Sequence, residues 1–143
     1  MNYFHLSIIT PDRQVFSEDV ENVSVPTTSG TIGILSHHTP LFSLLDEGEI
    51  KVVHGQKDLF LAIGEGFMEI TKTGVSILVS MAFHAHELNE QEIQKAYASA
   101  KDVVLKRGKG GDMSSAQAML RRSFFELKVL RRRQPHRTPS YSN

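Results

Sequence analysis

The chain has 143 residues with 16 acidic and 16 basic side chains, so its formal net charge is zero. This length suits one ordinary domain, or a small domain with an appendage. The absence of cysteine excludes disulfides and thiolate catalysis. No apolar run approaches the ~20 residues that a membrane-spanning helix needs. Residues 1–5 begin like a strand, without the basic and apolar regions of a secretory signal, so we expect no export signal.

Charge is distributed unevenly along the chain. Before Leu88 acidic residues outnumber basic ones, whereas after it basic residues dominate and include the run Arg131 to Arg133. An acidic first part and a basic second part indicate two regions with different partners.

The first part is built from short β-rich runs separated by turns. Apolar residues alternate with polar ones from Phe4 to Ile8, and Thr10 to Arg13 has the composition of a turn. Similar runs follow at regular spacing with glycine-containing turns, and Val75 to Val79 is the last clear strand. This pattern predicts an antiparallel β-sandwich domain over residues 1–86.

Within this domain, Ser29 to Leu41 reads as a shaped loop clamped onto the core. Gly30 and Gly33 flank a β-branched pair, so the backbone can take positive φ at both ends of a tight turn. Pro40 fixes its own φ and favours an extended residue before it. The run is too short for a helix and too interrupted for a long strand.

The apolar period changes at Glu87, where a helical hairpin is predicted over residues 87–134. Asn89 and Glu92 form a plausible capping box at the start of its first helix. One apolar face is expected on each helix. The first consists of Ile93, Ala96, Tyr97, Ala100, Val103 and Val104, and the second of Ala116, Met119, Leu120, Phe124, Leu127 and Leu130.

The glycine-rich link Arg107 to Gly111 is short, so the two helices should pack antiparallel. Pro135 should end the second helix. The polar residues 135–143 lack periodicity and are predicted to form a disordered tail.

Catalytic and metal-binding motifs are missing from the sequence. His84 and His86 could lie on one side of an extended segment, but they are separated in the chain from His37 and His38, and a catalytic zinc site needs three suitable ligands. No nucleophile elbow or phosphate-binding glycine loop occurs. We therefore expect no metal site and no active site within the chain itself.

The basic run of the second helix leaves an alternative open. Positive side chains of this kind could contact nucleic-acid phosphates. A basic-tailed nucleic-acid-binding or adaptor module on a β-sandwich is therefore the alternative hypothesis, although no recognised base-reading element accompanies the run.

Several segments together resemble the epsilon subunit of bacterial and organellar F-type ATP synthases. Leu6 to Asp12, Val23 to Pro26 and Ile63 to Ile70 are similar to strands of that family, and the order of sandwich and hairpin agrees. The fit is closest at the loop, in Gly30, Ile32, Gly33, Ile34, Leu35, His38, Pro40 and Leu41.

The resemblance implies a non-catalytic central-stalk rotor subunit that couples proton flow to ATP synthesis. Its partners would be the gamma subunit, the c-ring and the alpha and beta subunits, and nucleic acid would not be one. It would lie at the cytoplasmic face of the bacterial inner membrane, as a peripheral part of the complex. The implied contact residues for gamma and the ring are Gly30, Thr31, Ile32, Gly33, His38 and Pro40. Thr31 stands where many relatives carry Glu, and His38 would hold the loop by hydrogen bonds.

The resemblance also implies that the hairpin, when extended, inhibits ATP hydrolysis by meeting an acidic segment of the beta subunits. The residues implied for this contact are Arg121, Arg122, Lys128, Arg131, Arg132 and Arg133. Some relatives bind ATP through an (Ile/Leu)-Asp-x-x-Arg-Ala motif. Here the run Leu88 to Ile93 lacks both the Asp and the Arg, and Glu126 replaces one of two second-helix arginines while Arg122 matches the other. We therefore expect no cofactor and weak or no ATP binding.

Overall fold

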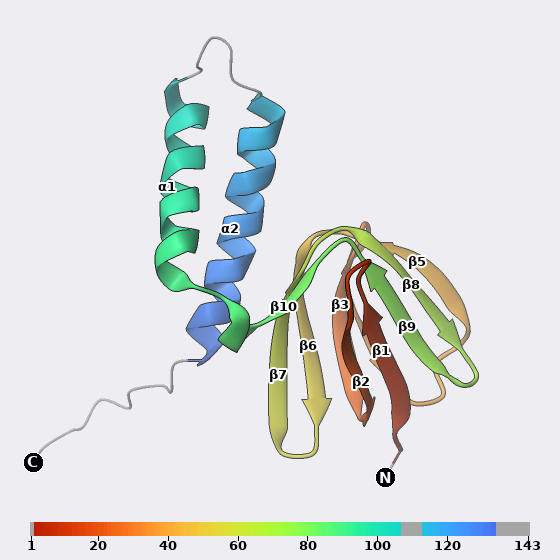
Figure 1. Cartoon of the computed structure of the whole chain (residues 1–143). Helices are drawn as coiled ribbons and strands as arrows, with labels where there is room; N and C mark the ends of the chain where they lie inside the picture. The colour runs from red at the N-terminus through yellow and green to blue at the C-terminus, as the bar shows by residue number, and fades with distance from the viewer. Residues whose placement is uncertain (1, 107–112, 134–143) are drawn as a thin grey trace, which may run out of the picture.

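The computed structural model describes residues 2–106 and 113–133, and it shows a β body with a pair of helices beside it (Figure 1). The strands are β1 (Phe4–Ile9), β2 (Gln14–Val20), β3 (Asn22–Thr27), β4 (Gly30–Leu35), β5 (Leu41–Leu45), β6 (Gly48–His54), β7 (Lys57–Ile63), β8 (Gly66–Thr71), β9 (Gly74–Val79) and β10 (Ala82–His84). They are followed by the 3₁₀ turn η1 (Ala85–Glu87), α1 (Glu90–Lys106) and α2 (Met113–Arg133). The predicted sandwich and helical hairpin are confirmed.

The strands follow one hydrogen-bonded path in the order β10-β7-β6-β3-β5-β8-β9-β1-β2, with β4 paired to β3. A single register pair, Thr27 with Leu45, joins β3 to β5 where the path turns from one layer to the other. The pairing is antiparallel as predicted, except that β1 and β9 run parallel.

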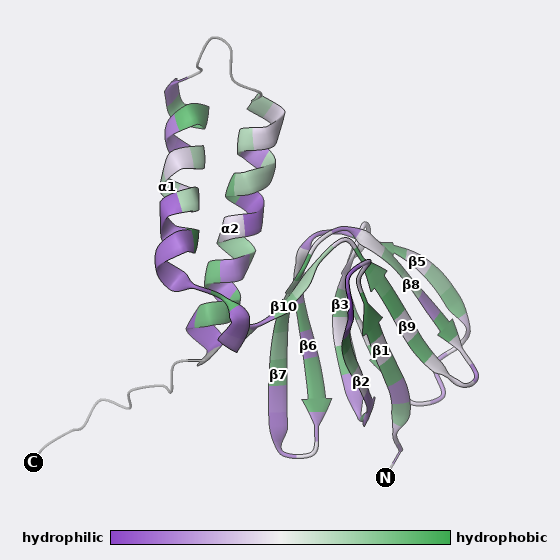
Figure 2. Ribbon diagram, in the orientation of Figure 1, coloured by the Kyte–Doolittle hydropathy of each residue, from purple (hydrophilic) through white to green (hydrophobic). Residues whose placement is uncertain are grey.

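The space between the layers is filled by aliphatic side chains. Leu6, Ile50, Met68 and Ile77 are all fully buried in one continuous cluster, and Figure 2 shows the corresponding hydrophobic stretches along the strands. Fully burying one such side chain contributes roughly 1.5–3 kcal/mol. All members of this cluster lie between Leu6 and Ala82, so the β body has a core of its own.

The predicted loop is partly wrong, because its first half is a strand. Residues Gly30–Leu35 form β4, paired with β3 along its whole length. Gly30 has a φ of 116° as expected, but Gly33 lies opposite Ser24 in the ladder and does not have positive φ. The second left-handed residue is instead His37, with a φ of 64° in the turn after β4.

The predicted cap of the first helix is present. The Asn89 side-chain oxygen accepts a hydrogen bond from the Glu92 amide at 3.2 Å, and the Asn89 carbonyl accepts one from Ile93 at 3.0 Å. Ile93 and Ala100 are buried, as their place on the predicted face requires. The sequence analysis missed β10 and η1, which bring His86 into a 3₁₀ turn instead of an extended segment.

The predicted apolar face of the second helix is wrong in part: Ala116, Leu120, Leu127 and Leu130 are half-buried, but two other members are exposed. Phe124 and Met119 are 54% and 41% exposed, whereas Ser123, Glu126 and Val129 are buried. The reason is that α2 packs against α1, η1, β6 and β7, so the covered surface extends beyond the apolar stripe to Ser123, Glu126 and Val129.

The helix link and the predicted tail, residues 107–112 and 134–143, lie outside the described residues. Among the described helices, none combines the length and apolarity needed to cross a membrane.

Candidate interaction surfaces

A row of apolar side chains crosses the outer face of four neighbouring strands. The register places Leu44 of β5 opposite Phe67 of β8, Phe67 opposite Leu78 of β9, and Leu78 opposite Ile9 of β1. These side chains are 37–58% exposed. Phe42, two residues before Leu44, is 63% exposed, and its ring centroid lies 5.4 Å from that of Phe67. We call these five residues the apolar row.

The sequence analysis missed the apolar row, although a signal was present. Each of four row members neighbours a buried core residue in sequence, as Phe67 neighbours Met68 and Leu78 neighbours Ile77. Successive side chains of a strand point to opposite faces, so such apolar pairs put one member outside. A contiguous apolar patch on the surface marks an interaction site.

The predicted ring-contact residues do not form one site. Gly30 and Thr31 begin β4, whereas His38 and Pro40 follow its far end. β4 runs from Gly30 to Leu35, so Gly30 lies roughly 16 Å from the strand end that His38 and Pro40 follow, at ~3.3 Å per residue. Ile32 and Gly33 lie between them, half-buried and exposed, respectively.

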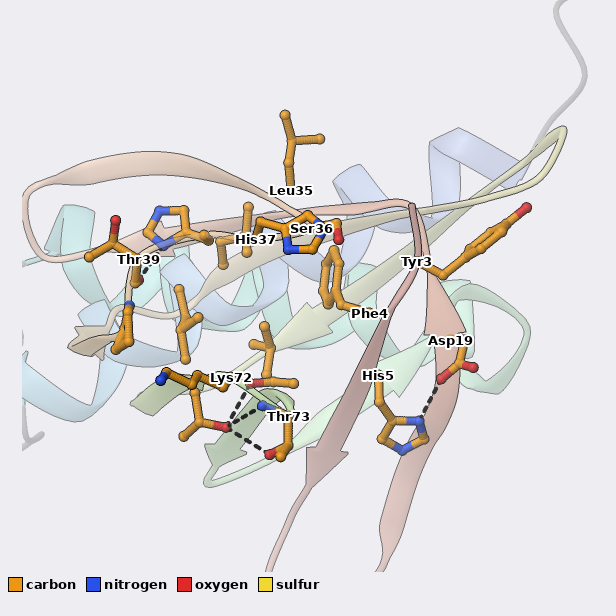
Figure 3. Close-up of a pocket in the computed structure, with 17 residues that line it drawn as sticks. Tyr3, Phe4, His5, Asp19, Leu35, Ser36, His37, Thr39, Lys72 and Thr73 are labelled. Atoms are coloured by element: carbon orange, nitrogen blue, oxygen red, sulfur yellow. Dashed lines mark hydrogen bonds and ion pairs between the residues drawn. The ribbon is translucent and has the colours of Figure 1, made fainter. Parts of the chain in front are cut away.

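The segment after β4 borders an open hollow of ≈ 730 Å³. Figure 3 shows His37 and Thr39 on one side of it, Lys72 and Thr73 on another, and His5 paired with Asp19 nearby. His38 Nδ1 donates to the Thr39 carbonyl at 2.6 Å. This hydrogen bond is local, to the next residue, and the role of His38 in holding the segment stays a prediction.

One face of α2 docks on the start of β6. Arg121, Phe125 and Arg132 share that face, because positions spaced by multiples of three or four lie together on a helix. Arg121 Nε donates to Glu47 Oε1 at 2.6 Å, and Arg132 Nη2 lies 3.5 Å from Glu49 Oε1.

Aromatic rings and a glycine complete this contact. The Arg132 guanidinium carbon lies 4.9 Å from the Phe60 ring centroid. A Cβ on Gly48 would crowd Pro26 Cγ at 3.0 Å and would lie 3.8 Å from Phe125 Cε1, an ordinary contact distance, so the Phe125 ring packs directly beside Gly48. We call the contacts of Glu47, Gly48, Glu49 and Phe60 with Arg121, Phe125 and Arg132 the latch.

The latch is weak for its size. The side chains of Arg121 and Arg132 are 57% and 49% exposed, and those of Glu47 and Glu49 are 20% and 12% exposed. Solvent therefore reaches the cationic half of each ion pair and screens it, which limits its contribution to about 1 kcal/mol. Glu49 Oε2 is buried without a hydrogen-bond partner among the described residues, which disfavours the docked state. A contact of this kind can open.

The structure separates the predicted beta-contact cations into three groups. Arg121 and Arg132 belong to the latch, and Arg122 donates to Glu126 at 2.7 Å on another face of α2. Lys128 and Arg131 are exposed and make no ion pair in the described part of the chain. The side chain of Arg133 lies outside the description.

A second contact, which we call the clasp, joins β10 and η1 to the β1–β2 turn. Arg13 Nη2 lies 2.5 Å from Glu87 Oε1, and the His84 amide donates to Glu87 Oε2 at 2.7 Å. Burial by itself would raise the pKa of Glu87, but the His84 amide and the Arg13 guanidinium together hold it below its usual range.

The histidine pairs do not form a metal centre. The rings of His84 and His86 stack with centroids 5.4 Å apart. Across residues 2–106 and 113–133, no group of three or more His, Cys, Asp or Glu side chains could hold a metal ion.

Comparisons with known proteins identify the family. The model of the ATP synthase delta/epsilon chain β-sandwich domain matches residues 3–85. An ATP synthase epsilon chain of Chloroflexus aggregans is 35% identical over 125 residues, which cover 87% of this chain and 90% of the relative. The chain belongs to the ATP synthase epsilon-chain family. The epsilon chain of Herpetosiphon aurantiacus is 36% identical over 128 residues, covering 90% of this chain and 94% of that one.

Solved structures support the same fold. A chain of the Euglena gracilis mitochondrial ATP synthase OSCP/F1/c-ring structure matches with a TM-score of 0.67 at 20% identity, covering 92% of this chain and 79% of its own length. A chain of the Tetrahymena thermophila mitochondrial ATP synthase central stalk/c-ring structure matches with a TM-score of 0.56 at 13% identity, covering 89% and 96%. The epsilon-family membership agrees with the rotor-subunit hypothesis and not with the nucleic-acid alternative.

Proposed function

We propose that this epsilon-family chain is a non-catalytic rotor subunit that binds the gamma shaft through its β body and inhibits ATP hydrolysis through its helical hairpin. It sits over the c-ring as a peripheral part of the complex at the cytoplasmic face of the inner membrane. Rotation with the shaft couples proton flow to ATP synthesis. The apolar row is the observation that carries this proposal.

The apolar row has the properties of a permanent docking face. Its five side chains lie on strands β5, β8, β9 and β1, and their buried neighbours anchor these strands in the core. An obligate partner interface is more apolar than the remaining protein surface. A rotating subunit needs such a firm contact on a rigid element, and the β body supplies one.

The hairpin has the properties of a reversible arm. In the docked state, Arg121 is paired with Glu47 and Arg132 with Glu49. These arginines are two of the cations that would meet the acidic beta segment, so the latch and the beta contact exclude each other. The docked hairpin is then the permissive state, and its release makes the basic face available for steering towards an acidic partner.

The chain should bind ATP weakly or not at all. Arg122, which matches one of the family's phosphate-contacting arginines, is already paired with Glu126 at 2.7 Å. A carboxylate at that distance repels phosphate and competes for the guanidinium. Calorimetry with the full-length chain checks this, and a dissociation constant in the low micromolar range would overturn it.

The proposed shaft contact is tested by charging the apolar row. Phe67→Glu and Leu78→Glu put a carboxylate in the centre of the docking face without touching the buried side of the strands. The matched control is Leu105→Glu, which charges a 71% exposed apolar residue on α1. We expect each row variant to bind a complex of alpha, beta and gamma subunits at least tenfold more weakly than the wild type, and the control to bind equally well. Equal affinity of row variants and control would reject the apolar row as the shaft contact.

A further inference from the structure

The segment that leads from the β body to the hairpin, β10 and η1, is held by residues of the β1–β2 region. Besides its ion pair with Glu87, Arg13 Nη2 donates to the Ala82 carbonyl at 3.4 Å. The Nε2 atom of His84 lies 3.2 Å from the Val15 carbonyl. The β1–β2 region therefore grips β10 and η1 at three separate residues.

Glu87 in the clasp is more completely hydrogen-bonded than Glu49 in the latch. Both carboxylate oxygens of Glu87 have partners, one in the guanidinium of Arg13 and one in the amide of His84. Glu49, by contrast, has one oxygen at 3.5 Å from its arginine and one that is buried without a partner in the described part of the chain. Breaking the clasp leaves both oxygens of a carboxylate whose side chain is only 21% exposed without their partners, whereas opening the latch parts Glu49 from a single oxygen contact at 3.5 Å.

Only one residue lies between the clasp and the hairpin. Glu87 ends η1, and Asn89 already caps α1 through its side chain and carbonyl. Leu88 between them has extended backbone, with φ −89° and ψ 132°. Leu88 caps η1, with its amide donating to the Ala85 carbonyl at 3.3 Å. A change of its two dihedral angles therefore reorients α1 and α2 while the hydrogen bonds inside η1 and α1 stay intact, and besides the latch only the packing of α2 on η1 has to part.

We propose that the clasp makes η1 a mechanical part of the β body, and that the hairpin pivots at Leu88 when the latch opens. Glu87 then moves with the sandwich and not with the helices. The arm that swings consists of α1 and α2 alone, on a one-residue hinge. Loss of the clasp would lengthen that hinge by η1 and loosen the orientation of the released arm. This inference concerns the chain by itself and holds whether or not the proposed partners are correct.

The test uses the full-length chain with pairs of spin labels and pulsed electron paramagnetic resonance. The chain has no native cysteine, so engineered cysteines label cleanly. Lys72→Cys on the β8–β9 turn is the reference, paired with either His86→Cys in η1 or Ser99→Cys in α1. All three positions are exposed. The variant Glu47→Gln/Glu49→Gln opens the latch.

We expect the latch variant to broaden the distance distribution between positions 72 and 99 at least twofold, while that between 72 and 86 keeps its wild-type width. Adding Arg13→Met or, independently, Glu87→Gln should broaden the 72–86 distribution as well. The matched control is Lys106→Met, which removes the ion pair with Asp102 within α1 and should change neither distribution. Equal widths for both pairs in the latch variant, narrow or broad, would overturn the proposal. So would an unchanged 72–86 distribution in both clasp variants.

Discussion

The β body and the hairpin are held together by different kinds of interaction. The body has an aliphatic core in which Leu6, Ile50 and Ile77 are fully buried. The hairpin meets the body through ion pairs, one phenylalanine ring and η1, and its arginines remain about half exposed. Burial of apolar area resists local opening, whereas exposed charge pairs do not. The comparison explains how one chain can contain both a rigid element and a movable one.

The largest expected effect is on the core of the body. Ile77→Ala should lower the free energy of unfolding of the β body by about 2–5 kcal/mol, because the lost side chain leaves a cavity between two packed layers. Chemical denaturation followed by circular dichroism measures this. A loss below about 1 kcal/mol would mean that the body is not the rigid element.

A smaller effect is expected at the helix cap. Asn89→Ala removes the side-chain acceptor of the Glu92 amide and should destabilise α1 by about 1 kcal/mol. The unfolding midpoint of the β body should not change, because its core contains no hairpin residue. Amide hydrogen exchange resolved by residue distinguishes the two regions. Equal acceleration in α1 and in β9 would contradict their independence.

The ion pairs of the latch should respond to salt and to charge removal alike. Glu47→Gln and Glu49→Gln should each weaken docking by at most about 1 kcal/mol, and raising the salt concentration to ~1 M should mimic them, because the Debye length then falls to ~3 Å. The 72–99 label pair reports this, with the Lys106→Met chain as control. If docking of the hairpin responds neither to these substitutions nor to salt, apolar packing and not the ion pairs holds the hairpin on the β body.

The clasp should appear in a pH titration. Because the folded-state pKa of Glu87 is lowered, its stabilising contribution is present above the ordinary carboxyl range and is lost as the pH falls through the lowered value. Arg13→Met should raise the pKa of Glu87, and nuclear magnetic resonance of its side chain measures the shift. An unchanged midpoint in Arg13→Met would remove Arg13 from the clasp.

The local sequence pattern predicted most strands and both helices, but not which of them pair or pack together. The alternation from Phe4 to Ile8 and the cap at Asn89 were sufficient for β1 and α1, because both depend on neighbouring residues. The strand β4 was mistaken for a loop because its two glycines look like turn residues, and only pairing with β3 fixes Gly33 as extended.

The candidate sites were harder to predict because they depend on distant pairs. Glu47 and Arg121 are 74 residues apart in sequence, and nothing near either residue indicates the other. The face of α2 was predicted only in part for the same reason, since the position of the β body decides that Phe125 is half-buried and Phe124 exposed. The basic residues themselves were identified from the sequence, but their pairing in the docked state was not.

The central claim is that a rigid β body holds the rotor while a separable hairpin inhibits. ATP hydrolysis by a complex reconstituted with the chain ending at Glu87, compared with the full-length chain, tests it most directly. We predict that the shortened chain stays bound through its intact core and apolar row, and that hydrolysis rises severalfold. Equal hydrolysis with both chains, under conditions in which the full-length complex is latent, would contradict the account.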